Sequence, residues 1–420
     1  MQTFLRREHL SLSVFAGTGV AWLLLALLAY AVGDRAAHVS RPRHQHGAAP
    51  IDLIRAAYLT FALNLLLLGV TALWIATAAA KAGGLIHLAT SVYVDSLTAR
   101  DLLLENKLFT GMRLFYAALP ATACLATALL CLGPLPRKIR CLLLATLIGN
   151  TLALFILPIV MSQRLLFLQL LLSCYLVACL IRGRMVGWGW SLLAAGLFLG
   201  LWMAREAIIN PMIGRSTLDI STQKLAFYLV NDMWNGLAPL AAEIPHTWGG
   251  LNLEGVMFLT FTDGYFARIL ASRTEALQAV LGGGKFPLLT AAYVDFGPVL
   301  GALFLAFIGF IIRRIFIHAR HSLVFTVTYA QIGAALMFSN HSVYFTHQNL
   351  LFSLILIAGL LKLATPQHIP QIRPDLPFFR TRRKPKARPS PPPDSLGRPA
   401  TLATAQSRQP HLARPRHEQA

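Results

Sequence analysis

The stretch LLTAAYVDFGPVLGALFLAFIGFII, from Leu288 to Ile312, decides the fold class of this chain. It is long enough and apolar enough to cross a bilayer as a helix, which takes about 20 residues. Asp295 lies within its first turns, and a carboxylate inside a membrane span is costly and often functional. The same carboxylate could instead brace the start of the helix by accepting backbone N–H bonds. The sequence leaves these two roles open.

The composition of the whole chain agrees with this class. Of its 420 residues, 56% are hydrophobic and 13% are charged, against about 25% charged in soluble domains. Apolar runs of about 18 residues or more recur along the chain, and the alternating segments of about ten residues that are typical of a membrane β-barrel are missing. We therefore expect an all-α polytopic integral membrane protein with nine or more transmembrane helices.

The loops between the apolar runs differ in charge, and this difference predicts a topology. Clusters of Lys and Arg follow every second span, which places those loops in the cytoplasm by the positive-inside rule. The N-terminus would then be periplasmic despite Arg6 and Arg7, and a cleavable signal peptide is the alternative for the first span. The expected spans are 12–32, 56–80, 112–133, 140–160, 165–182, 187–204, 289–312, 322–340 and 348–363, and the periplasmic loops are 81–111, 161–164, 205–288 and 341–347.

Two regions depart from the regular pattern of spans and short loops. We expect residues 1–363 to form the transmembrane domain and the basic, Pro-rich tail 364–420 to be a disordered cytoplasmic segment. The loop from about 205 to 288 is too long for a simple connection. It carries apolar residues at helical spacing, so its segments could lie in the membrane interface or dip back into the bundle.

Much of the net charge of +20 lies in the tail and short loops, which indicates lipid contact rather than nucleic-acid binding.

Polar residues gather at the predicted periplasmic end of the spans. Arg164, Arg205 and Glu206 lie at span ends, and Asp295 lies a short way below the same surface. An Arg at a span end can snorkel to the headgroups, but several together can bind phosphate oxygens bidentately. The pattern favours a phosphorylated lipid as the ligand. The sequence lacks the motifs of metal-dependent and serine hydrolases, so we expect no metal and no cofactor.

Four segments of the chain resemble the O-antigen, or oligosaccharide repeat-unit, polymerases of bacterial inner membranes. The span 286–316 is similar to a family span with the pattern Y-x-D-F-G-x-x-G. The resemblance covers about residues 80–363. The four segments are SQRLLFLQLLL (162–172), FYLVNDMWNGLAPLAAEIPHTWGG (227–250), FPLLTAAYVDFGPVLGALFLAFIGFIIRRIF (286–316) and FSNHSVYFTHQN (338–349).

The resemblance implies a metal-independent glycosyltransferase that uses no nucleotide sugar. A glycan held on undecaprenyl pyrophosphate would move to a hydroxyl of an incoming lipid-linked repeat unit, at the periplasmic face of the inner membrane. The departing pyrophosphate needs positive charge, and the attacking hydroxyl needs a base. Candidates for binding the pyrophosphate and the substrate are Arg164, Arg205, Arg215, Arg273, Arg100 and Tyr293. Candidates for the catalytic base are Asp295, Glu206, Glu243 and His246, and the sequence does not choose among them.

The resemblance also implies partners and leaves alternatives. The expected partners are the undecaprenyl-pyrophosphate-linked oligosaccharide, membrane lipid, and a chain-length regulator and a flippase of the same pathway, with no nucleic acid. The product would be O-antigen or exopolysaccharide.

An O-antigen ligase that transfers glycan to the lipid A core is the nearest alternative, and the Y-x-D-F-G span favours the polymerase. A polysaccharide or lipid transporter would favour charges at the bilayer midplane and internal repeats, neither of which the sequence displays.

Overall fold

A computed structural model describes the helical part of the chain. All described residues belong to one unit, Met1–Phe379, and every regular element among them is an α-helix. This confirms the predicted all-α class. The described residues are 17–40, 51–94, 96–161, 164–185, 187–209, 216–241, 246–262, 264, 286–319 and 321–365. The predicted tail lies outside them from residue 366 onward.

The helices follow one another with mostly short connections, and each predicted span corresponds to a helix or to a consecutive helix pair. Their bounds are α2 Thr18–Val39, α3 Leu53–Lys81, α4 Leu85–Val94, α5 Ser96–Glu105, α6 Met112–Ala117, α7 Leu119–Leu132, α8 Arg137–Met161 and α9 Arg164–Arg182. They continue with α10 Trp188–Ile209, α11 Thr217–Ala241, α12 Glu254–Leu259, α14 Leu288–Ala319, α15 Leu323–Met337 and α16 Gln348–Leu363.

Six helical stretches of the described chain are long and apolar enough to cross a membrane. They are Gly19–Val39, Leu53–Lys81, Met112–Leu132, Arg137–Pro158, Leu165–Arg182 and Leu288–Ala319. The last helices, α15 and α16, are also apolar but shorter. The protein is thus a helical membrane protein, whereas nine spans and their orientation remain predictions.

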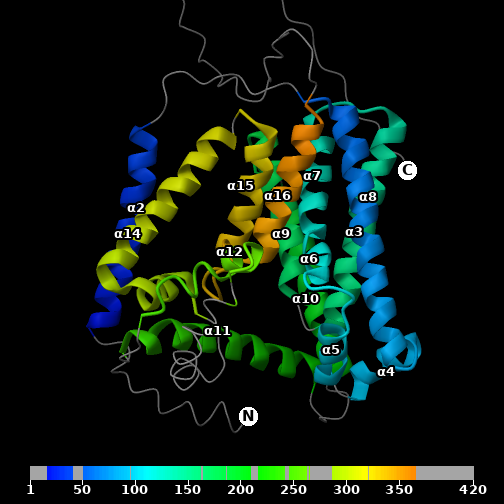
Figure 1. Cartoon of the computed structure of the whole chain (residues 1–420), viewed down its shortest axis with the longest axis horizontal. Helices are drawn as coiled ribbons and strands as arrows, with labels where there is room; N and C mark the ends of the chain where they lie inside the picture. Colours follow the sequence, from blue (N-terminus) through cyan, green and yellow to red (C-terminus); the bar gives the residue numbers. More distant parts are fainter. Residues whose placement is uncertain are drawn as a thin grey trace, which may run out of the picture. The chain divides into compact units, whose positions relative to one another are not determined.

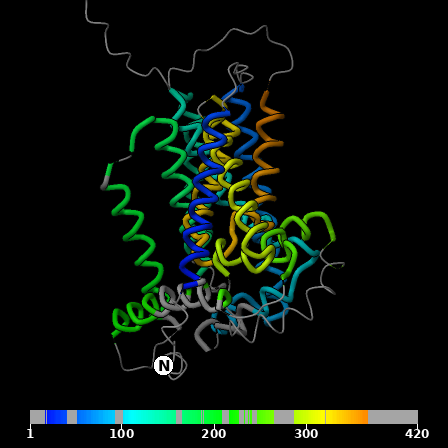
Figure 2. Tube along the Cα trace, turned by 90° about the vertical axis from the view of Figure 1, so that its left-hand side faces the viewer, coloured from blue at the N-terminus to red at the C-terminus, as the bar shows by residue number. Residues whose placement is uncertain are grey.

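The apolar helices stand roughly along one direction and alternate in sense, so that their loops collect at two ends (Figures 1 and 2). At one end the N–H of Asp52 donates to the carbonyl of Ala364 (3.1 Å), which joins the start of α3 to the end of α16. At the other end the N–H of Leu288 donates to the carbonyl of Ser339 (2.8 Å), which joins the start of α14 to the end of α15. We call the first the basic end, because its short loops carry the Lys and Arg clusters, and the second the α11 end.

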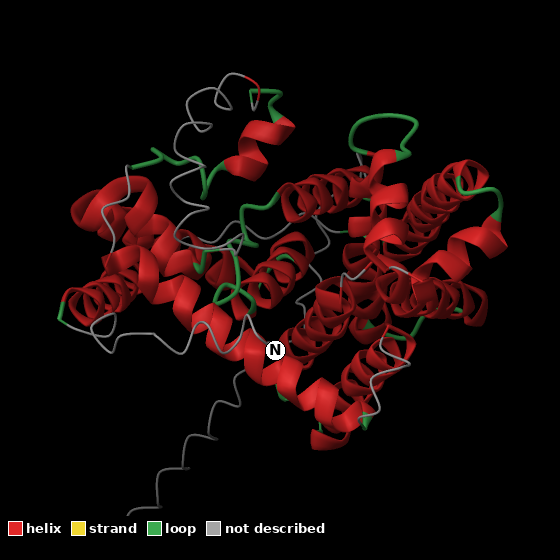
Figure 3. Ribbon diagram, turned by 90° about the horizontal axis from the view of Figure 1, so that it is seen from below, coloured by secondary structure: helices red, strands yellow, loops and turns green. Residues whose placement is uncertain are grey.

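Helix α11 crosses the helix ends instead of running along the bundle, as the views from the side and from below both show (Figures 1 and 3). It forms much of the first part of the long loop 205–288, where the sequence predicted helical segments. Its neighbours are α2, α10 and α14. Two hydrogen-bonded contacts fix its place, because Thr290 Oγ1 of α14 donates to the carbonyl of Gly236 (2.6 Å) and Lys224 reaches Glu206 of α10.

Helices α2 and α14 run in the same direction and pack at very short range. The indole N–H of Trp22 donates to the carbonyl of Leu289 (3.1 Å) near the helix starts. A Cβ at Gly33 would lie 1.8 Å from the carbonyl oxygen of Ala306, so only glycine permits this approach. Close backbone contact through small residues is the usual way for helices to associate in a membrane.

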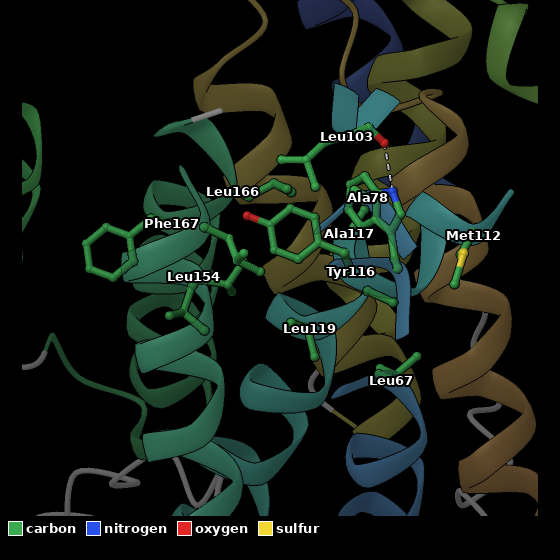
Figure 4. Packing of buried hydrophobic residues seen from close by; sticks show 14 of the residues in the cluster. Leu67, Ala78, Leu103, Met112, Tyr116, Ala117, Leu119, Leu154, Leu166 and Phe167 are labelled. Carbon is green, nitrogen blue, oxygen red and sulfur yellow. Dashed lines mark hydrogen bonds between the residues drawn. The ribbon is translucent and has the colours of Figure 1, made fainter. Parts of the chain in front are cut away.

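The remaining helices pack around a core of aliphatic and aromatic side chains. Tyr116 lies among Leu103, Leu154 and Phe167, and the indole N–H of Trp74 donates to the Leu103 carbonyl (2.8 Å; Figure 4).

A buried polar set joins α3, α7 and α8. The Thr122 hydroxyl donates to Asn64 Oδ1 (2.9 Å), and Asn150 Nδ2 donates to Thr122 Oγ1 (3.0 Å). These uncharged interhelical bonds fix the register of the three helices.

Candidate functional site

Helix α14 is broken near its start, at Gly297 and Pro298. Gly297 has φ 72° and ψ −175°, a conformation that residues with a side chain rarely adopt. Pro298 has no N–H group, so the carbonyl of Val294 cannot have its usual partner in the helix. The N–H of Thr247, in the segment after α11, donates to that carbonyl instead (3.3 Å). The kink of α14 therefore depends on a segment that lies well before it in the chain.

The Asp295 carboxylate is the centre of this contact and is fully buried. Its Oδ1 accepts from the Leu251 N–H (3.1 Å) and from the Thr247 hydroxyl. Its Oδ2 accepts from the Asn252 N–H (2.8 Å) and from Asn252 Nδ2 (2.6 Å). The main-chain carbonyl of Asp295 accepts from the Trp248 N–H (3.0 Å). Such a set of donors satisfies both carboxylate oxygens and holds the side chain in place.

This geometry favours the bracing role for Asp295 over the catalytic role. Both of its oxygens are occupied by donors of the 247–252 loop and none of its surface is exposed, whereas a base must reach a substrate proton. Tyr293, the substrate-binding candidate two residues earlier, packs its ring against Trp22 of α2 (centroids 5.2 Å apart).

His246 lies directly beside the kink. Its Nδ1 is 3.2 Å from the carbonyl of Val294, and because a carbonyl only accepts, Nδ1 carries the hydrogen and Nε2 the basic lone pair of the neutral ring. A Cβ at Gly297 would lie 3.1 Å from two atoms of this ring. The ring also contacts that of Trp248 edge-on (6.0 Å, 76°). His246 therefore stays a candidate base, with its orientation set by the broken helix.

A second acid–base pair joins α11 to the turn between α15 and α16. His341 Nδ1 lies 2.7 Å from Asp232 Oδ1, and both side chains are only partly exposed. A carboxylate accepts and cannot donate when ionised, so this contact places the hydrogen of the neutral imidazole on Nδ1 and its lone pair on Nε2. A carboxylate behind a histidine also stabilises the imidazolium that forms when the ring takes up a proton. The pair thus has the composition of a general base.

Two further side chains of the same turn extend this pair. The ring of Tyr344 stacks on His341 (6.3 Å, 14°) and is tilted against His347 (6.3 Å). His347 caps α16, because its Nδ1 accepts from the N–H of Asn349 (3.3 Å). Burial, and then the negative charge of Asp232, raises the pKa of the Tyr344 phenol above its usual value. This phenol therefore stays protonated and can donate a hydrogen bond at any physiological pH.

Glu206 forms a separate charged group at the junction of α10 and α11. Its side chain is fully buried, and its Oε1 accepts from Arg205 Nη1 (3.1 Å). Its Oε2 pairs with Lys224, whose side chain is 38% exposed. Two described cations, Arg205 and Lys224, thus pair with this one buried carboxylate. This arrangement assigns Glu206 to holding Arg205 and Lys224, because its own oxygens are engaged.

The side chains of several predicted site residues lie outside the part of the chain that the structure describes. Glu243, Arg215 and Arg273 lie outside the described residues. Arg164 is the first residue of α9 and therefore lies at the α11 end, and Arg100 lies within α5, but the structure describes neither side chain.

Sequence reasoning missed Asp232, Lys224 and Tyr344, and it included His341 only as the first residue of the predicted periplasmic loop 341–347. Asp232 and His341 are 109 positions apart, so no local motif links them. A usable signal was that both stand in segments that resemble the polymerase family, FYLVNDMWNGLAPLAAEIPHTWGG and FSNHSVYFTHQN.

Comparisons with models of protein families, with curated proteins and with solved structures found no match to this chain. Within the described part of the chain, no group of three or more His, Cys, Asp or Glu side chains is placed to hold a metal ion. The fold and the site together define a helical membrane protein with acid–base side chains and paired cations at one end of its bundle.

Proposed function

We propose that this protein is a membrane-embedded glycosyltransferase that polymerises undecaprenyl-pyrophosphate-linked oligosaccharide repeat units at the periplasmic face of the bacterial inner membrane. The observation that carries the proposal is the Asp232–His341 pair. It supplies an oriented base at the same end of the bundle as the cationic group around Glu206. The resemblance of four segments to the O-antigen polymerases supports the choice of reaction.

The reaction needs one proton acceptor and one anion-stabilising group. A hydroxyl of the incoming repeat unit attacks the anomeric carbon of the growing glycan, forming the new C–O bond while the bond from that carbon to the pyrophosphate oxygen breaks. His341 Nε2 takes the hydroxyl proton, and Asp232 stabilises the resulting imidazolium. The pair of electrons leaves with undecaprenyl pyrophosphate, whose charge is stabilised by nearby cations.

The cations proposed for this second role are of two kinds. For Arg205 and Lys224 the structure gives the geometry, because both pair with the buried Glu206 carboxylate. Arg164, Arg215, Arg273 and Arg100 remain proposals from the family resemblance. Guanidinium groups suit this task because they bind two phosphate oxygens at once and stay charged when partly desolvated.

Deletion of the gene, followed by gel analysis of surface glycans, tests the proposal. We expect loss of long polymer, retention of single-repeat products, and recovery of polymer when the intact gene is returned. Long chains that accumulate without attachment to the lipid A core would instead indicate the ligase. Loss of all surface glycan, with repeat units retained inside the cell, would indicate the transporter. An unchanged glycan would refute all three.

Substitutions in the base pair test the mechanism. His341→Ala should lower the polymerisation rate by about 10²- to 10⁴-fold, the usual contribution of a positioned general base, and Asp232→Asn should also lower it. His87→Ala is the matched control, because His87 is an exposed histidine on α4 at the same end of the bundle. A normal chain-length distribution in cells that carry His341→Ala would exclude this pair as the base.

A further inference from the structure

The segment that braces α14 presents one aromatic side chain in an unusual backbone conformation. Trp248 has φ 51° and is followed by Gly249 with φ 93°. Residues other than glycine seldom adopt this left-handed region, and a bulky residue there is a true outlier. The described chain has one other such residue, Phe261, with φ 58°.

The backbone on both sides of Trp248 is fixed by hydrogen bonds. Its own N–H donates to the carbonyl of Asp295 (3.0 Å), and the N–H of Gly250 donates to the carbonyl of Thr247 (3.0 Å). The next two amides, of Leu251 and Asn252, donate to the Asp295 carboxylate. The unfavourable conformation is therefore imposed by the loop and cannot relax locally.

The ring gains little from the fold in return. Trp248 is 59% exposed, although Thr247 and Asn252 in the same loop are buried. Its described ring contact is the edge-on pair with His246. A rigid backbone that directs a large apolar ring outward at the expense of backbone strain is a feature of sites that await a ligand.

The kind of ligand follows from the surroundings of the ring. A Trp that only anchors a protein in the membrane interface needs a suitable depth, which an unstrained backbone also provides. Here the orientation is held, and the ring lies next to a histidine and in a loop with polar buried side chains. The apolar face of a pyranose ring offers C–H groups to an aromatic surface, while its hydroxyls remain available to polar neighbours.

We propose that Trp248 is an aromatic platform on which a sugar ring of the lipid-linked glycan stacks, with Asp295 acting as the positioning residue that holds the platform in place. The inference rests on the proposed function, because it names the part of that substrate which this loop binds. It also gives the buried Asp295 a link to activity that requires no contact with the substrate.

The test measures retention of a defined probe by purified protein in detergent. The probe is the lipid-linked repeat unit extracted from the deletion strain. The variants are Trp248→Phe, Trp248→Leu and Trp248→Asn, and the matched control is Phe261→Asn, which makes the same change at the other exposed aromatic with positive φ. Thermal unfolding of each variant is measured in parallel.

We expect Trp248→Phe to keep most of the binding, and Trp248→Leu and Trp248→Asn to lose on the order of tenfold in affinity. Trp248→Asn should be at least as stable as the wild type, because asparagine tolerates this backbone region. Phe261→Asn should bind as the wild type does. A loss of binding without a loss of stability is the result that a merely structural role cannot produce.

Three outcomes would overturn the platform. The first is unchanged binding by Trp248→Leu, which would assign the ring to membrane anchoring. The second is an equal loss of binding in the Trp248→Asn and Phe261→Asn variants. The third is failure of the wild type to retain the probe. The polymerase proposal fails in a different way. If the wild type retains the probe through Trp248 while deletion leaves polymer length unchanged, the platform stands and the reaction assigned to it does not.

Discussion

Replacement of Asp295 by asparagine distinguishes a structural role of this carboxylate from a catalytic one. Asparagine has nearly the same shape as aspartate, so the change removes the charge and turns one acceptor into a donor. If Asp295 were a general base, the variant would fold normally and lose activity. If it braces the broken helix, the variant should lose stability, and activity should fall with the folded fraction.

The donors around the carboxylate set the size of the effect. One oxygen faces the Leu251 N–H and the Thr247 hydroxyl, and the other faces the N–H and Nδ2 of Asn252. The hydroxyl can rotate and the Asn252 amide can flip to accept from the new amide, but a backbone N–H cannot change its role. In either orientation of the new side-chain amide, one buried N–H therefore stays opposed to a donor. An unsatisfied buried group costs about 1–3 kcal/mol, and the bonds that remain lose their charge assistance, so we expect a loss of about 2–4 kcal/mol.

The assay is SDS-induced unfolding of the purified protein in mixed micelles, followed by circular dichroism. Asp52→Asn is the matched control, because Asp52 also accepts two backbone N–H bonds, from Ile54 (2.9 Å) and Arg55 (3.1 Å), but at an exposed helix N-cap. Asparagine caps as well as aspartate does, so this control should unfold like the wild type. If Asp295→Asn unfolds at the same SDS fraction as the control, the bracing argument is wrong.

Three further predictions concern the packing and the charges of the described helices. Gly33→Ala should destabilise the protein by about 1–3 kcal/mol in the same assay, because its Cβ would meet backbone 1.8 Å away, whereas Gly69→Ala has open space and should be neutral or slightly stabilising. Lys224→Met leaves buried Glu206 with one cation fewer, and since Lys224 is 38% exposed we expect a screened loss of about 1–2 kcal/mol, less than additive with Glu206→Gln. Tyr344 has a raised pKa in the folded protein, so its contribution to the free energy of unfolding is complete below about pH 10 and is lost as the pH rises further. Tyr344→Phe should therefore lessen alkaline unfolding, measured by circular dichroism from about pH 9 upward.

The positions of the long apolar helices could be predicted closely from the sequence, because in a bilayer a spanning segment must be apolar along its length and satisfy its own backbone. The helices α4 and α5 lie in the predicted loop 81–111 and were not predicted. The predicted span 348–363 coincides with α16. The predicted span 12–32 ends several residues earlier than α2 does, because Asp34 and Arg35 are charged residues of the kind that end an apolar run. In the structure Asp34 is still helical, and its Oδ1 lies 3.8 Å from Nε of Arg313 in α14, so the helix continues past its apolar run into a segment with charged neighbours.

The candidate site was less accessible to sequence reasoning, because its contacts join distant segments. The sequence places Arg205 and Glu206 at the same span end because they are neighbours in the chain, and in the structure they form an ion pair. It could not reveal Lys224, which reaches Glu206 from the next helix, nor the pairing of Asp232 with His341. Such pairings depend on α11 crossing the helix ends, and periodicity along one segment contains no information on that crossing.

The broken helix explains why a carboxyl group is retained in the most apolar of the candidate spans. Gly297 and Pro298 leave carbonyls of α14 without helical partners, and in a membrane protein each unsatisfied group costs several kcal/mol. The 247–252 loop satisfies those carbonyls, but a loop brings N–H groups of its own that also need acceptors. Asp295 provides two acceptor oxygens at the one position that faces them. The kink thus requires the loop, and the loop requires the carboxylate. A substitution that straightens α14 should therefore leave Asp295 buried without its donors and destabilise the protein.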